Sequence, residues 1–87
     1  MQTTMNLLDT ALKVAPMPEW AERLSVHRNA LRNARDRGHL TPVLAGSLAI
    51  ELNEDPAKWI TLAVLEGEKE SPAKDRLVKR LAGIFKQ

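Results

Sequence analysis

Three pairs of residues divide the second half of this chain into short helices, because each joins a helix-capping side chain to a proline. The pairs are Thr41-Pro42, Asp55-Pro56 and Ser71-Pro72. The capping side chain accepts a hydrogen bond from a backbone N–H of the first helical turn, and proline suits the first helical position. The pairs therefore predict helices over about 42–52, 56–69 and 72–86.

The first half of the chain predicts three more helices. Residues 4–15 carry apolar side chains at helical intervals, with Thr3 or Thr4 as the cap. Pro16 and Pro18 end this helix, and Pro18 can open the next one, over about 18–24. A third helix is expected over 28–37, ended by Gly38. No stretch has a strand pattern, so we predict an all-α protein of five to six short helices.

Composition limits the class of protein. The 87 residues include no cysteine and two histidines, so a disulfide or thiolate metal site is impossible and no zinc pattern is present. No apolar run approaches the roughly 18 residues of a membrane span, and no signal-peptide pattern opens the chain. The carboxylates of Glu51, Glu54 and Asp55 straddle a helix end without a nucleophile beside them. We expect a cytoplasmic protein that is not an enzyme and uses no metal, cofactor, membrane or small-molecule substrate.

Charge is segregated along the chain. Residues 1–22 carry −2, residues 23–37 carry +4, residues 38–68 carry −4 and residues 69–87 carry +4. Positive charge is thus concentrated on the predicted third helix and on the C-terminal segment. Such segregation indicates an oriented contact with a polyanion, which a uniformly basic chain would not give.

The segment 28–37 is unusually polar for a helix. Its only apolar side chains are Ala30, Leu31 and Ala34, which share one face at helical spacing. The other positions are four arginines, two asparagines and one aspartate. Arginine and asparagine are the donors that phosphates and base edges accept. A merely solvated face is the alternative, but the position of this helix after a helix and a turn favours a recognition helix.

Residues 17–38 resemble the helix-turn-helix regulators of the lambdoid phage repressor and Cro family. The resemblance rests on six apolar positions around the turn: Trp20, Ala21, Leu24, Val26, Leu31 and Ala34. With the helices opening at Thr41-Pro42 and Asp55-Pro56, it extends over roughly residues 5–66. The family usually has glycine in the turn, where the backbone is left-handed, whereas this sequence has Ser25.

The resemblance implies double-stranded DNA as the partner, with the third helix in the major groove. Base edges would be contacted by His27, Arg28, Asn29, Arg32 and Asn33. The sugar-phosphate backbone would be contacted by Arg35, Arg37, His39 and Thr41, and by backbone amides near Met17 and Glu19. His27 acting only as a cap beside the helix remains an alternative.

Residues 1–70 are expected to form this DNA-binding domain, and residues 71–87 an amphipathic helix that packs on the domain or on a partner subunit. Binding of nucleic acid or of an anionic membrane remains open for this basic helix. The helix at 56–69 is apolar nearly all round, and its own core accounts for Trp59, Ile60 and Ala63. The apolar side chains that this core does not use predict a homodimer, with an interface formed by Leu62, Leu65, Leu81 and Phe85.

The function that these expectations favour is sequence-specific regulation of transcription. A phage or prophage repressor would act by occupying an operator and excluding polymerase. The alternative is a protein-interaction module, such as an antitoxin or adaptor, that keeps the same helical scaffold without reading DNA.

Overall fold

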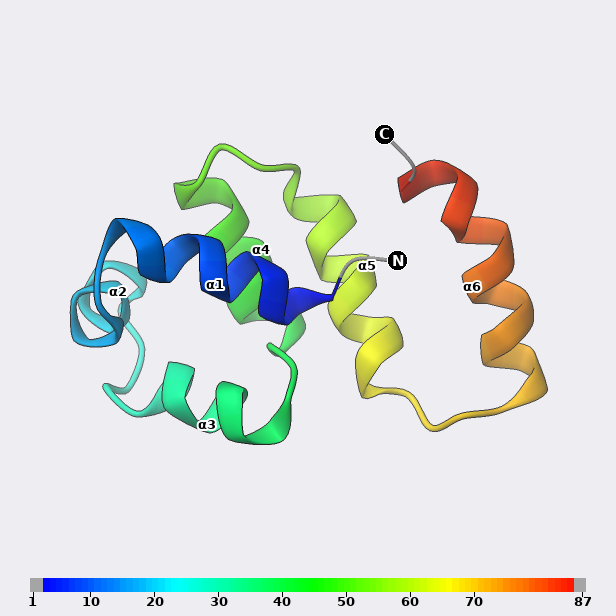
Figure 1. Cartoon of the computed structure of the whole chain (residues 1–87), viewed down its shortest axis with the longest axis horizontal. Helices are drawn as coiled ribbons and strands as arrows, with labels where there is room; N and C mark the ends of the chain where they lie inside the picture. The colour runs from blue at the N-terminus through cyan, green and yellow to red at the C-terminus, as the bar shows by residue number, and fades with distance from the viewer. Residues whose placement is uncertain (1–2, 86–87) are drawn as a thin grey trace.

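The computed structural model describes residues 3–85, with side chains up to residue 82. The described chain folds into six consecutive α-helices (Figure 1): α1 (Thr4–Val14), α2 (Met17–Leu24), α3 (Ala30–Arg37), α4 (Pro42–Glu51), α5 (Pro56–Gly67) and α6 (Pro72–Phe85). No strand occurs within residues 3–85. The predicted all-α class is therefore confirmed.

The cap and proline pairs begin α4, α5 and α6 as predicted. The side chains of Thr41, Asp55 and Ser71 accept hydrogen bonds from the backbone N–H groups of Leu44, Ala57 and Lys74, at 3.3, 3.0 and 3.1 Å respectively. Each proline occupies the first residue of its helix. These starts depend on chemistry within four residues, and for that reason the sequence was sufficient to locate them.

The start of α3 differs from the prediction. The helix begins at Ala30, so Arg28 and Asn29 lie in a turn that precedes it. The physical reason is local, because the imidazole Nδ1 of His27 accepts a hydrogen bond from the backbone N–H of Asn29 at 3.1 Å. A side chain that binds the backbone two residues ahead stabilises a turn in competition with the helix.

The core lies between α1, α4 and α5, and α2 and α3 close one end of it. Its largest fully buried apolar side chains come from five helices and from the connection between α3 and α4: Leu8, Trp20, Leu31, Leu40, Leu48 and Leu62. Helices α4 and α5 have the most extensive contact of any pair. Gly46 permits their approach, because a Cβ atom there would lie 2.7 Å from Cδ1 of Ile60.

The assignment of faces on α5 was right for Trp59 and Ala63, which are buried, and wrong for three other residues. Leu62 and Leu65, predicted at a dimer interface, are 0% and 3% exposed inside a single chain. Ile60, predicted in the core, is 39% exposed, and Val64 is 47% exposed. Because the helix is apolar nearly all round, its periodicity could not say which side meets α4. A charge at Leu62 or Leu65 would therefore disrupt the core and would not simply separate two subunits.

Candidate nucleic-acid interface

The connection between α2 and α3 has the left-handed turn that the resemblance implied. Ser25 adopts φ 56° and ψ 44°, a conformation that non-glycine residues seldom take. The backbone N–H of Ser25 donates to the carbonyl of Glu22 at 3.1 Å, and that of Val26 donates to Ala21 at 3.0 Å. These bonds close the C-terminus of α2 and redirect the chain toward α3.

The apolar positions of this unit lie where they were predicted. Trp20, Ala21, Leu31 and Ala34 are all buried. The indole N–H of Trp20 donates to the carbonyl of Ala11 at 2.7 Å, which fixes α2 against α1. The α2–α3 unit is therefore anchored to the core from one side and leaves the polar side of α3 in solvent.

Three of the predicted base-contacting residues are brought together with the start of α2. Arg28, Asn29 and Arg32 line an open pocket of about 380 Å³ whose other wall is Met17 and Pro18. All three polar residues are exposed. No described acidic side chain forms an ion pair with Arg28 or Arg32. Their donors face solvent and are available to an external acceptor.

His27 forms a hydrogen bond within the turn that precedes α3. Its Nδ1 atom accepts the N–H of Asn29, so in the neutral ring the proton is on Nε2. The residue is exposed, which leaves the Nε2–H group as a free donor. The hydrogen bond to Asn29 stabilises the turn before α3 and does not exclude an outward contact.

The start of α2 also offers donors. Pro16 is the N-cap of α2. The first hydrogen bond of the helix runs from the backbone N–H of Trp20 to the carbonyl of Pro16, at 3.1 Å. The backbone N–H groups of Met17 and Glu19 precede it and have no partner among the described residues. The carboxylate of Glu19 contacts Arg23 at 3.5 Å, so this acidic group is partly neutralised beside the donors.

Arg35 forms an ion pair that the sequence did not predict. Its Nη2 atom lies 2.8 Å from Oδ1 of Asp9 on α1, so the side chain is engaged within the chain. Both groups are about half exposed, and a pair of this kind contributes little to stability. Asn33 and Arg37, by contrast, are exposed without a side-chain partner among the described residues.

Beyond α3 the chain turns sharply toward α4. Gly38 takes the left-handed conformation at φ 91°, and the N–H of His39 donates to the carbonyl of Ala34 at 3.2 Å. His39 is half-buried, whereas Thr41 is exposed. The hydroxyl oxygen of Thr41 caps α4, and its proton is left free for an acceptor outside.

The predicted dimer residues are not brought together on one surface. Leu62 and Leu65 are in the core, and Leu81 on α6 is half-buried. The side chain of Phe85 lies outside the described residues. The large apolar side chains that the described structure does expose were not proposed as contacts: Val14, Val43, Ile50, Ile60, Val64 and Leu77.

Comparisons of this chain with protein-family models, with curated proteins and with solved structures found no match. Within the part of the chain that the structure describes, no three histidine, aspartate or glutamate side chains converge as a metal site would require. None of the described helices is long and apolar enough to cross a bilayer.

Proposed function

We propose that this chain is a sequence-specific double-stranded DNA-binding regulator, in which α2 and α3 form a helix-turn-helix unit and α3 enters the major groove. The observation that carries the proposal is the pocket at the start of α3. There Arg28, Asn29 and Arg32 face solvent beside the unpaired amides of α2. Arginine binds the O6 and N7 atoms of guanine, and asparagine binds the N6 and N7 atoms of adenine.

The charge distribution supports the same function. Residues 23–37 carry +4, and the described ion pairs of α3 involve only Arg35. The unpaired arginines supply the phosphate attraction, and the amides at the start of α2 supply a second, oriented contact to the backbone. Polar groups in a fixed geometry read sequence, whereas a flexible basic tail does not.

A homodimer completes the proposal. A two-fold pair of such domains would place its two copies of α3 about 34 Å apart, on successive turns of the major groove. Such a dimer would regulate transcription by occupying its operator and excluding polymerase, as a phage or prophage repressor would. No chemical step and no cofactor is required for that action.

The test begins with selection of duplexes from a random-sequence library by the purified protein. Selected and scrambled duplexes are then titrated by fluorescence anisotropy. Arg28→Ala should weaken binding to the selected duplex by about 10- to 100-fold and to the scrambled duplex only slightly. Arg28→Lys keeps the charge but loses the two-pronged guanidinium, so it should lose nearly as much on the selected duplex.

Lys58→Ala is the charge-matched control. It removes one cation from the first turn of α5, which lies on the opposite side of the molecule from α3 (Figure 1). This variant should leave both titrations unchanged. Failure of the library to enrich any sequence, together with a stable complex with another protein, would favour the interaction-module alternative.

A further inference from the structure

Helix α6 is held beside the rest of the molecule and is not folded into its core. It lies next to α5, at one end of the 38 Å long axis (Figure 1). Leu77 on this helix is 49% exposed, and Val78 and Leu81 are only half-buried. Apolar side chains at this spacing form one face of a helix, so α6 has an apolar face that its own chain covers incompletely.

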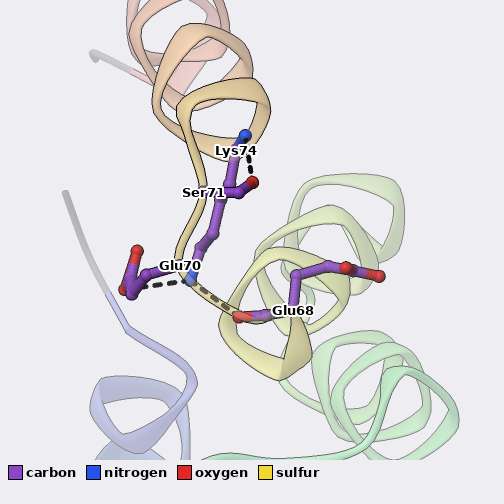
Figure 2. Close-up of polar contacts among 4 residues, drawn as sticks. All are labelled: Glu68, Glu70, Ser71 and Lys74. Carbon is purple, nitrogen blue, oxygen red and sulfur yellow. Dashed lines mark hydrogen bonds and ion pairs between the residues drawn. The ribbon is translucent and has the colours of Figure 1, made fainter.

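Lys74 links the first turn of α6 to the end of α5 (Figure 2). Its Nζ atom donates to the backbone carbonyl of Glu68 at 3.1 Å and lies 3.3 Å from the carboxylate of Glu70. Its backbone N–H donates to the hydroxyl of Ser71 at 3.1 Å, and its side chain is 15% exposed. The first turn of α6 is therefore fastened to the end of α5, and α6 is presented in a defined orientation.

A second apolar surface lies on α4 and α5. We call it the α4–α5 apolar face and define it by Val43, Ile50, Ile60 and Val64, which are 76%, 61%, 39% and 47% exposed. Val43 and Ile50 flank Gly46 along one side of α4, and Gly46 contacts Ile60. The exposed side chains of the two helices thus form one continuous surface. The chain's own α6 leaves this surface open.

The two surfaces carry opposite charge. Residues 38–68, which include the α4–α5 apolar face, have a net charge of −4. Two exposed acidic residues are close to the face in sequence, since Glu51 follows Ile50 and Glu68 is four residues after Val64. Residues 69–87 have a net charge of +4. By helical spacing, Arg80 borders one edge of the apolar face of α6 and Asp75 the other, while Arg76 and Lys79 lie on the opposite side of the helix. Pairing α6 with another α6 would bring like charges together, whereas pairing α6 with the α4–α5 apolar face brings opposite charges together.

We propose that the α4–α5 apolar face binds α6 of a second copy of this chain, and that the exchange is reciprocal. One chain carries both complementary surfaces, which is the requirement for a two-fold interface in which each contact occurs twice. This inference rests on the homodimer of the proposed function and assigns its interface. It does not depend on DNA binding, and its test is made without DNA.

The absence of cysteine from the chain allows a direct test with single-cysteine variants. Val64→Cys and Leu77→Cys proteins are prepared separately, mixed and oxidised. The mixture should give a disulfide-linked dimer containing one chain of each kind, and neither protein alone should give one. Val14→Cys, at a 62% exposed position on α1, is the control and should not cross-link to either protein.

Each other pattern of cross-linking overturns the proposal. A dimer from Val64→Cys alone would mean that two α5 helices meet, and a dimer from Leu77→Cys alone would mean that two α6 helices meet. A wild-type protein that sedimentation shows to be monomeric at tens of micromolar would also overturn it. DNA titrations of the same samples then decide the proposed function separately.

Two further variants separate loss of the interface from loss of the fold. Leu77→Glu should raise the dimer dissociation constant by about tenfold or more while the helical circular dichroism is retained, and Leu77→Met should remain dimeric. Arg80→Glu changes only an exposed charge and should weaken the dimer most at low salt. Unchanged dimerisation of both Leu77→Glu and Arg80→Glu would overturn the exchange.

Discussion

Thr4 and Glu66 join the first turn of α1 to the last turn of α5 through two hydrogen bonds. The backbone N–H of Thr4 donates to one carboxylate oxygen of Glu66 at 2.7 Å, and the Thr4 hydroxyl donates to the other. The same hydroxyl accepts the backbone N–H of Leu40 at 2.9 Å. Thr4 is fully buried. Leu40 lies in the connection between α3 and α4, directly after His39. This network therefore holds the segment that carries the chain from α3 to α4.

Thr4→Val should lower the free energy of unfolding by about 1–3 kcal/mol, because it leaves a buried N–H and a carboxylate oxygen without their partner. Thr4→Ser retains the hydroxyl and should cost clearly less. Urea denaturation measures the free energy of unfolding of both variants, and an unchanged m-value shows that the change is one of stability. Equal stability of Thr4→Val and wild type would show that the hydroxyl does not link these segments.

Ser25→Gly should raise the free energy of unfolding by roughly 0.5–1 kcal/mol. Ser25 occupies the left-handed region at φ 56°, where a Cβ atom is unfavourable and glycine is not. Gly38→Ala, at φ 91°, is the complementary change and should destabilise the protein. A Ser25→Gly protein less stable than wild type would mean that glycine's greater freedom in the unfolded chain outweighs the strain at this turn.

The sequence was most informative where structure depends on neighbouring residues. The starts of α4, α5 and α6 follow from a cap and a proline, and the burial of Trp20 and Leu31 follows from helical spacing. The start of α3 was placed two residues early, because the hydrogen bond from the Asn29 N–H to His27 has no signature in residue type alone.

Features that depend on distant contacts were missed. Which side of α5 is buried is decided by the packing of α1 and α4, so apolar content alone could not separate Leu62 from Ile60. The role of Glu66 requires a residue at the other end of the chain, and in the sequence it looks like a surface carboxylate. The ion pair of Arg35 with Asp9 on α1 was not predicted, because nothing in the helix of Arg35 indicated it.

Gly46 and Ile60 should be strongly coupled in stability. Alanine at Gly46 would gain about 0.5–1 kcal/mol from helix propensity, but its Cβ would lie 2.7 Å from Cδ1 of Ile60. Gly46→Ala should therefore be neutral or destabilising in the wild-type chain and stabilising when combined with Ile60→Ala. A double-mutant cycle from urea denaturation should give a coupling energy of about 1 kcal/mol. Strict additivity would mean that α4 and α5 adjust without strain.

The pair between Arg35 and Asp9 yields a prediction for DNA affinity. Asp9 holds the Arg35 guanidinium at 2.8 Å, so Asp9→Asn should free that cation for a phosphate and strengthen binding to selected and scrambled duplexes alike. The slope of log K against log salt should steepen by about 0.9. Arg37→Ala, which removes an exposed cation from the same helix, should change affinity and slope by similar amounts in the opposite direction.

Two comparisons isolate the role of Arg35 from the simple loss of a negative charge. Asp36→Asn removes the same charge from α3 without releasing Arg35, and it should strengthen binding less than Asp9→Asn does. In an Arg35→Ala background, Asp9→Asn should lose most of its effect, because no cation remains to be released. Titrations of the wild type, the three single variants and the double variant on both duplexes at several salt concentrations provide the measurement. An undiminished gain from Asp9→Asn without Arg35 would show that α1 itself faces the DNA, and the predicted phosphate contact of Arg35 would then be abandoned.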